Sequence, residues 1–431
     1  MNYSHKSDRA LMKQANQNLV LQLIQGRGPI SRKAIAQISG LSQASVSGIT
    51  GELIARGLVH EAGEADGQGR VGRREVLLRL NAHAGYVVGV MLAMRAIVCV
   101  LTDLDANVLH AMETPLPFVD QAGPVPKVFP ADDVIHATIQ AIEHLLDIAQ
   151  LDPARLLGIG VGVNGIVDAD IGVSRLAPHF GWRNVPLAAP LAAHFGISVL
   201  LENDGRALTI AEQWFGTGRG VDHFVTVVAG HGIGAGVIAN GQIYRGAMSG
   251  AGEFGHIVLQ PDGPRCSCGK RGCLEALASE PAILRQIEEA LATGAPSLLA
   301  GTQPLTLEAV ATVADAGDVL ARRVLSNAGR WLGIGIASLV NILNPQLLII
   351  NGETVCAGRW YFEPMETALR EHVFDGLADS LRILAEPGRN DMWARGAACV
   401  MLSALFASPV HQQEPEPVRA VRAPARAERN P

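Results

Sequence analysis

The sequence of 431 residues is poor in cysteine, and its six cysteines are unevenly distributed. Three of them crowd into eight positions, at Cys266, Cys268 and Cys273. The others stand alone in apolar surroundings, where we expect small core residues: Cys99, Cys356 and Cys399. One short segment therefore needs an explanation for its thiols.

An N-terminal targeting signal is also missing. The chain begins without a continuous apolar segment or a small-residue cleavage site, so we expect a cytoplasmic protein. The longest apolar stretch, residues 331–350, is interrupted by Asn341, Asn344 and Pro345. It predicts a buried helix followed by a strand and no membrane association. In a cytoplasmic protein, clustered cysteines indicate a metal site before a disulfide.

Charged residues make up only 18% of the chain and hydrophobic residues 48%, which argues against wholesale disorder and favours large buried cores. The length predicts about three domains. The net charge of −6 is unevenly spread, because residues 1–80 contain 11 Lys and Arg against 6 Asp and Glu, whereas the rest contain 24 against 35. The basic N-terminal part therefore predicts contact with an anion.

Residues 16–80 have the pattern of a winged helix-turn-helix domain, after a flexible N-terminus over 1–15. Three short helices are predicted over 16–58, and Ser31 and Ser42 cap the second and third of them. Two strand-like runs joined by a glycine-rich loop follow and predict a wing. This arrangement lays one helix into the DNA major groove. The alternative is a small solvated helical domain with a charged hairpin.

The side chains that we expect to meet DNA are short polar residues of the third helix and arginines of the wing loop. They are Ser42, Gln43, Ser45, Ser47, Thr50, Arg70 and Arg73. On the second helix, Ile35 and Ile38 are expected to face the core. The wing arginines suit the negative potential of the minor groove.

From residue 84 onward the pattern changes to an α/β protein. Two apolar hairpins, near 86–110 and 223–243, each open a half in which strands then alternate with helices. We expect an internal duplication that forms two α/β lobes around a cleft. Residues 411–431 are dominated by Pro, Ala, Arg and Glu and are predicted to be a disordered tail.

Several motifs of the body resemble the ROK family of repressors and sugar kinases. They are "ENDGRALTIAEQWFG", "GHGIGAGVIANGQIYRGAMSGAGEFGHI", "CSCGKRGCLEA", "NPQLLIING" and "ARGAACVMLSAL". The resemblance covers residues 84–406 and implies an actin/hexokinase-like fold with two α/β lobes, assembled as a homodimer or homotetramer. With the winged helix-turn-helix in front, the whole chain is similar to the sugar-responsive transcriptional repressors of the family.

The clustered cysteines follow a histidine with the spacing H-x9-C-x-C-x4-C, within a zinc loop at 256–273. Four such ligands close a tetrahedral shell, which predicts a structural Zn²⁺. Gly269 and Gly272 would let the loop fold back. The alternative is three reduced thiols without a ligand. The resemblance implies the same zinc ligands: His256, Cys266, Cys268 and Cys273.

Carboxylates flank this loop at Glu253 and Glu275, and they accept charge-assisted hydrogen bonds from sugar hydroxyls. The resemblance implies five sugar-binding positions: Asn203, Asp204, Glu253, His256 and Glu275. Each of them alone could be a surface or capping residue; Asp204, for example, could be only a helix cap. His179 and Trp182 are further candidates for the pocket wall, although Trp182 could equally belong to the core.

The kinase members of the family need a base, which Asp204 would supply, and a first phosphate loop of the form Asp-x-Gly-Gly-Thr. Residues 89–96 read "GVMLAMRA" at the equivalent place, and His231 stands where kinases usually carry Thr. We therefore expect no catalytic residue in use, with Asp204 a vestigial base, and a body that binds sugar without phosphorylating it.

Three hypotheses remain open at this stage. The favoured one is a repressor of carbohydrate genes that binds operator DNA and responds to a sugar; the resemblance implies that the sugar weakens DNA binding. The second is an ATP-dependent sugar kinase with a regulatory DNA-binding head. The third is a scaffold that binds another protein, and some relatives do respond to a regulatory protein partner.

Overall fold

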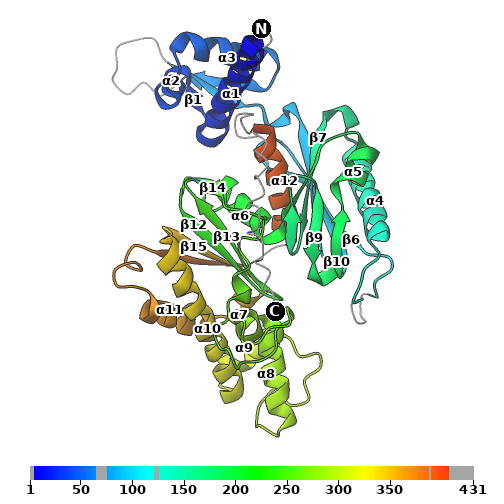
Figure 1. The fold of residues 1–431 in the computed structure, drawn as a ribbon, viewed down its shortest axis with the longest axis vertical. Coiled ribbons are helices and arrows are strands. Elements are labelled where there is room, and N and C mark those ends of the chain that lie inside the picture. The colour runs from blue at the N-terminus through cyan, green and yellow to red at the C-terminus, as the bar shows by residue number, and fades with distance from the viewer. Residues whose placement is uncertain (1–3, 65–74, 121–125, 388–389, 407–431) are drawn as a thin grey trace, which may run out of the picture. The chain divides into compact units, whose positions relative to one another are not determined.

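The computed structural model describes residues 4–64, 75–120, 126–387 and 390–406. The chain divides into two compact units, both visible in Figure 1. The first unit comprises residues 1–81 and 403–431, and the second comprises residues 82–402. Within the described ranges, no helix is long and apolar enough to cross a membrane.

The first unit contains three helices and a small antiparallel sheet of strand order β1-β3-β2. Its elements are α1 (Ser4–Arg27), β1 (Ile30–Ser31), α2 (Arg32–Ser39), α3 (Gln43–Ala55), β2 (Val59–Glu64) and β3 (Val76–Leu80). Helices α2 and α3 are the predicted helix-turn-helix pair, and β2 and β3 are the two strands of the predicted wing. The winged helix-turn-helix fold is thereby confirmed.

The tight turn between α2 and α3 follows from local signals. Ser31 Oγ accepts a hydrogen bond of 3.2 Å from Ala34 N at the start of α2, and Ser42 Oγ accepts one of 3.1 Å from Ser45 N at the start of α3. Gly40 ends α2 in the left-handed region, with φ 70°. These caps allow two helices to follow each other within three residues.

Helix α1 begins at Ser4, which corrects the expectation of a flexible N-terminus over 1–15. That stretch contains neither Pro nor Gly, and nine of its 15 residues are the good helix formers Ala, Leu, Met, Lys, Arg and Gln. Tertiary contacts add to this propensity, because Lys13 Nζ and Gln17 Nε2 both donate to the carboxylate of Glu52 on α3, at 2.7 and 2.5 Å.

The burial of Ile38 also differs from the expectation, because its side chain is 45% exposed. Helix α2 has only eight residues, and Ile35 is its one buried residue. The last turn of α2 therefore extends past the small core of this unit.

Two five-stranded mixed sheets form the second unit. The first contains β4 (Tyr86–Leu92), β5 (Ala96–Thr102), β6 (Val108–Pro115), β7 (Leu156–Val163) and β11 (Val199–Asn203). The second contains β12 (Phe224–Ala229), β13 (Ile233–Ala239), β14 (Gln242–Ile243), β15 (Leu347–Gly352) and β16 (Arg382–Pro387). We call each sheet with the helices packed on it the first and the second lobe.

Both sheets have the same topology. Strand β4 pairs antiparallel with β5 and parallel with β7, and β12 pairs antiparallel with β13 and parallel with β15. The complete orders are β11-β7-β4-β5-β6 and β14-β13-β12-β15-β16. The repeat agrees with the predicted internal duplication, and the α/β class with two lobes is confirmed.

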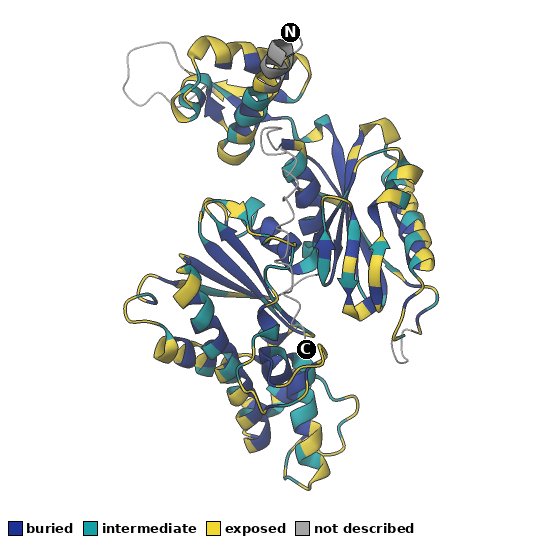
Figure 2. Ribbon diagram, in the orientation of Figure 1, coloured by how far each residue is buried: buried dark blue, intermediate teal, exposed yellow. Residues whose placement is uncertain are grey.

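Helices cover these sheets and enclose two separate hydrophobic cores, so that most strand residues are buried (Figure 2). The first core includes residues of α4 (Ala131–Ala149) and α5 (Ala188–Phe195). The second includes residues of α7 (Leu274–Ala278), α8 (Glu280–Ala292), α9 (Leu307–Asp315), α10 (Val319–Leu343) and α11 (Arg359–His372). The remaining helices are α6 (Asp204–Trp214) and α12 (Asn390–Phe406).

Short elements complete the unit. A small antiparallel sheet contains β8 (Ile166–Asp168), β9 (Val173–Ala177) and β10 (Trp182–Pro186). The 3-10 turns are η1 (Ala82–Ala84), η2 (Pro153–Arg155), η3 (Pro178–Phe180), η4 (Phe254–His256) and η5 (Glu353–Ala357).

Two glycines let α12 approach the first sheet very closely. A Cβ atom at Gly89 on β4 would lie 2.0 Å from the carbonyl oxygen of Ala394, and one at Gly160 on β7 would lie 1.8 Å from that of Ala397. No other residue fits these positions without moving the helix. The start of α12 is thereby held against the strand that leads into the β4–β5 turn.

The isolated cysteines divide into two groups. Cys99 and Cys399 are buried, as expected, whereas Cys356 is exposed. Cys356 lies in η5 directly after β15, where Ala357 takes the buried position instead. An apolar sequence neighbourhood did not reveal which side of this turn faces solvent.

Candidate functional site

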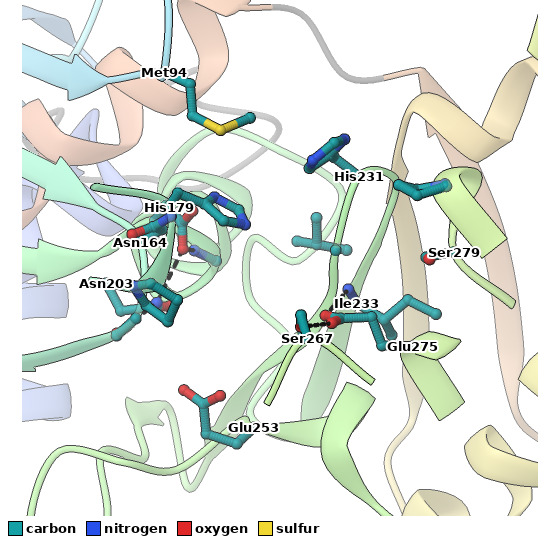
Figure 3. A pocket seen from close by; sticks show the side chains of 18 of the residues that line it. Met94, Asn164, His179, Asn203, His231, Ile233, Glu253, Ser267, Glu275 and Ser279 are labelled. Carbon is teal, nitrogen blue, oxygen red and sulfur yellow. Dashed lines mark hydrogen bonds between the residues drawn. The ribbon is translucent and has the colours of Figure 1, made fainter. Parts of the chain in front are cut away.

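A cavity of about 660 Å³ lies in the second unit and is lined by residues of both lobes (Figure 3). It is bordered by the β4–β5 turn, the β12–β13 turn, η4, α7 and the starts of α6 and α12. Its size is typical of small-molecule sites, which span roughly 300–1,000 Å³. The cavity is lined by all five predicted sugar-binding residues: Asn203, Asp204, Glu253, His256 and Glu275.

Asn203 and Asp204 stand where β11 ends and α6 begins. Asn203 Oδ1 accepts a hydrogen bond of 3.1 Å from Arg206 N and so caps the helix, while its Nδ2 donates to Gly165 O and to Asp204 Oδ1. Asp204 Oδ1 also accepts from Gly205 N at 2.8 Å. Burial raises the pKa of Asp204, although the hydrogen bond from Gly205 opposes this shift.

In Figure 3, Glu275 lies across the cavity from Asn203, and Glu253 lies below both in that view. Glu275, in the first turn of α7, accepts hydrogen bonds from Ile233 N at 3.3 Å and from Ser267 Oγ at 2.8 Å. Glu253 Oε2 lies 3.8 Å from His256 Nε2. Burial raises the pKa of Glu253, and His256 opposes the shift. Three carboxylates thus converge on one cavity.

The four predicted metal ligands come together next to this cavity. One ligand atom from each lies within 4.8 Å of all the others. Cys268 Sγ and Cys273 Sγ are 3.7 Å apart, and His256 Nδ1 is 3.6 Å from Cys266 Sγ. A tetrahedral site with Zn–S bonds of 2.3 Å has an edge of about 3.8 Å. The donor set and its spacing therefore fit a tetrahedral metal ion.

The backbone of the loop explains how the ligands converge. Gly269 and Gly272 have φ of 89° and 69°, in the left-handed region that glycine favours. A Cβ atom at Gly272 would lie 1.5 Å from the carbonyl oxygen of Gln260. The predicted fold-back at these two glycines is therefore present, and at position 272 only glycine fits.

A buried ion network behind the cavity escaped the sequence analysis. Glu202, which is 1% exposed, accepts from Arg206 Nε and from Arg245 Nε, both at 2.7 Å. Arg206 Nη1 also donates to the carbonyl oxygens of Ser249 and Ala251, at 2.9 and 3.1 Å. The network ties α6 to the loop that leads to Glu253. Glu202 and Arg206 are four positions apart, but Arg245, Ser249 and Ala251 join them only in the folded chain.

Two further candidates for the pocket wall have different outcomes. His179 does line the cavity, with its ring centroid 5.7 Å from that of His231, and burial lowers its pKa. Trp182 is a core residue: its ring stacks on Phe180, and its Nε1 donates to Phe129 O at 2.8 Å.

In the first unit, the predicted DNA-contacting residues of α3 divide by exposure. Ser42, Gln43, Ser45 and Ser47 are exposed at the start of the helix. Thr50 is fully buried, which contradicts its prediction as a DNA contact. It donates to Val46 O at 2.8 Å and accepts from Arg32 Nε at 3.1 Å, so the position points toward the core.

The predicted wing contacts, Arg70 and Arg73, lie outside the described residues. Strands β2 and β3 are antiparallel on either side of that segment, as the wing prediction requires.

Comparison with known proteins adds a family to this geometry. The sequence model of the ROK family matches residues 87–404, which make up most of the chain. The chain belongs to the ROK family.

ROK proteins that regulate transcription resemble this chain over nearly its whole length. The xylose repressor of Bacillus subtilis is 30% identical over 92% of this chain and 97% of its own. The transcriptional dual regulator NagC of Escherichia coli is 33% identical over 87% of this chain and 89% of its own. The crystal structure of a ROK transcriptional regulator homologous to the E. coli MLC protein superposes with a TM-score of 0.80, at 32% identity and 92% and 97% coverage.

A ROK kinase resembles only part of the chain. The glucokinase of Streptomyces griseus, solved with glucose and AMPPNP, has a TM-score of 0.62 and 27% identity. It covers 73% of this chain and 99% of its own. That share is about what residues 87–404 make up, so the kinase matches a region the size of the ROK body while the regulators extend beyond it.

Proposed function

We propose that this ROK protein is a DNA-binding repressor of carbohydrate genes that is controlled by a sugar in the described cavity. The observation that carries the proposal is the near full-length match to repressors, together with exposed polar residues at the start of α3 and three converging carboxylates in the second unit. The ROK glucokinase of Streptomyces griseus, by contrast, matches only 73% of this chain.

The cavity offers hydrogen-bond acceptors suited to a polyol. Asp204, Glu253 and Glu275 present carboxylate oxygens, and each can accept two hydroxyl groups in charge-assisted form. The amide of Asn203 is engaged with Arg206 N, Gly165 O and Asp204, so its role is to position Asp204. A sugar bound here would exchange hydroxyl–water hydrogen bonds for hydroxyl–carboxylate bonds.

The cluster of His256, Cys266, Cys268 and Cys273 would hold a structural zinc ion. Bound zinc would supply folding energy to a loop that buries little apolar surface, on the order of 10 kcal/mol of apparent binding energy. His256 Nδ1 faces Cys266 while its Nε2 faces Glu253, so the imidazole links the cluster to the cavity. Ser267 does the same through its hydrogen bond to Glu275.

The body binds sugar and does not phosphorylate it. Asp204 stands at the place of the kinase base, but Met91, Leu92 and Met94 line the cavity where the first phosphate loop of ROK kinases would lie. Apolar side chains there cannot hold metal-bound phosphates, which need backbone N–H groups and polar ligands.

Repression and its relief then follow from thermodynamic linkage between sugar binding and DNA binding. On DNA, Ser42, Gln43, Ser45 and Ser47 would contact base edges or phosphates, and Arg70 and Arg73 the minor groove. A homodimer would present two such heads to a palindromic operator. A coupling of about 1–3 kcal/mol between sugar and DNA binding is enough to switch a promoter.

The test separates the two binding activities. Genomic DNA fragments retained by the full-length protein are sequenced with and without xylose, glucose and N-acetylglucosamine, and one such fragment is used for fluorescence anisotropy. We expect Gln43→Ala and Arg73→Ala to weaken DNA binding without changing sugar affinity, and Glu253→Gln to do the reverse. Failure to retain any specific fragment, or equal damage to sugar binding by all three variants, would refute the proposal.

A further inference from the structure

The cavity of the proposed sugar site is longer than the group of carboxylates that would hold a sugar ring. In Figure 3, Met94 and His231 lie at one end, and Glu253 lies at the opposite end. Asn203 and Glu275 lie between them on facing sides. One end of the cavity is thus left without a role in the function proposed above.

This second end is mainly apolar and contains an indole, with Glu113 as a charged neighbour across the strands from Val98. The β4–β5 hairpin contributes Met91, Met94 and Val98 to the lining, and the start of α12 contributes Trp393. Val98 and Ala394 belong to one apolar cluster against which Met91 packs, so Trp393 is adjacent to the hairpin. The close approach of Ala394 to Gly89 holds that helix start in place. We call Met91, Met94, Val98 and Trp393 the apolar end.

The charges of the cavity disfavour an anion. Five carboxylates and two guanidinium groups line it: Glu113, Asp204, Glu253, Glu275 and Glu353, with Arg265 and Arg285. Glu353 packs directly on the backbone of the glycine-rich turn, since a Cβ atom at Gly230 would lie 1.5 Å from its Oε2. A phosphate placed against this turn would meet a carboxylate, and like charges at such a site oppose binding.

The size of the cavity favours a ligand larger than one sugar ring. Its volume of about 660 Å³ lies in the middle of the range of roughly 300–1,000 Å³ that small-molecule sites span, which leaves room for a ligand larger than one sugar ring. A flat indole and polarizable methionine side chains suit the apolar face of a second ring, whose hydroxyls can reach polar groups at the rim.

We infer that the effector is an uncharged saccharide of two rings. The first ring lies between Asp204, Glu253 and Glu275, and the second lies against the apolar end. This inference rests on the proposed function and narrows it: neither a free monosaccharide nor a sugar phosphate is the preferred ligand.

The test measures affinity by calorimetry on the full-length protein. The probes are xylose, glucose and N-acetylglucosamine, the 6-phosphates of the two hexoses, and the β-linked disaccharides xylobiose, cellobiose and chitobiose. We expect one disaccharide to bind at least about tenfold more tightly than its monosaccharide unit, because the second ring gains the contacts of the apolar end. We expect both phosphates to bind more weakly than the free sugars.

Variants locate the second ring. Trp393→Ala and Met94→Ala should each weaken disaccharide binding about tenfold and leave monosaccharide binding within about twofold, while Trp393→Phe restores most of the loss. Thermal unfolding and zinc content confirm that each variant is folded. Glu253→Gln is the matched control and should weaken both classes of sugar.

The outcomes are distinguishable. If a monosaccharide or a sugar phosphate binds as tightly as every disaccharide, or if the variants at the apolar end affect both classes equally, the two-ring inference is wrong and the sugar-sensing function stands. If no sugar of any length binds, the proposed function falls and the inference falls with it.

Discussion

The two lobes of the second unit share one strand topology but differ in chemistry at equivalent turns. The end of β4 and the β4–β5 turn line the cavity with the apolar side chains of Met91, Leu92 and Met94. The turn between β12 and β13 contains glycines instead, and Ile233 N within this segment donates a hydrogen bond to Glu275. The duplicated topology brings both turns to the same cavity, and the side chains decide what each turn does there.

The lobes also differ in how their functional residues are held. Asp204, at the end of the first sheet, is positioned by backbone geometry and a helix cap. Glu253 and Glu275, in the second lobe, flank a loop whose ligand cluster brings four side chains within 4.8 Å. The difference teaches that a carboxylate can be placed by regular secondary structure alone or beside a loop that is folded around a cluster of potential metal ligands.

The largest effect is therefore expected from breaking the cluster of the second lobe. Cys273→Ser removes a buried ligand, so zinc should be lost, together with apparent binding energy on the order of 10 kcal/mol. Mass spectrometry of metal content and thermal unfolding check this. Cys356→Ser, at an exposed cysteine outside the cluster, is the control and should change neither. One zinc per chain in Cys273→Ser with an unchanged unfolding temperature would contradict the assignment.

A smaller loss of stability is expected from breaking the buried ion network of Glu202, Arg206 and Arg245. Arg206→Met leaves buried Glu202 with a missing partner, which should lower the free energy of unfolding by about 3–5 kcal/mol. Arg245→Met removes a partner that is 39% exposed and should cost less. Denaturant unfolding measures both. Equal costs for the two variants would show that burial of Arg206 is not what makes the network important.

The pH dependence of stability and of sugar affinity tests the role of Asp204, the carboxylate of the first lobe. Burial raises the pKa of Asp204, so the folded protein binds this proton at a pH where the unfolded chain has released it. Between the raised pKa and the ordinary value of 3.8, this group therefore makes the ligand-free protein more stable as the pH falls. Sugar affinity should fall over the same interval, because a hydrogen-bond acceptor is neutralised.

Calorimetric titrations and thermal unfolding across this pH interval measure the two trends, and Asp204→Asn should reduce both, while Glu253, whose pKa burial also raises, still contributes. If both trends persist unchanged in Asp204→Asn, another group is responsible for them.

The smallest expected effect concerns ATP. With the apolar turn of the first lobe in place of a phosphate loop, adding ATP to the sugar-bound protein should produce no ADP above the rate without protein. A coupled ADP assay checks this, with a ROK glucokinase as the positive control. Steady ADP release that depends on sugar and disappears in Asp204→Asn would show that the apolar turn does not prevent phosphoryl transfer.

The sequence by itself was sufficient for the features that depend on neighbours along the chain. The helix-turn-helix caps at Ser31 and Ser42 and the left-handed turns at Gly269 and Gly272 are local, because each is set by hydrogen bonds or dihedral angles within a few residues. The ligand cluster was predictable from the same kind of spacing.

Only the tertiary structure decided which side chains meet across the fold. Thr50 has the polarity of a DNA contact but turns inward, because Arg32 and Val46 O satisfy its hydroxyl. Arg206 meets Ser249 and Ala251 more than 40 residues away along the chain. Trp393 lies near the β4–β5 turn, about 300 residues earlier, because Gly89 admits the backbone of α12. No period or spacing in a sequence encodes such contacts, since they arise when separate segments pack to remove apolar surface from water.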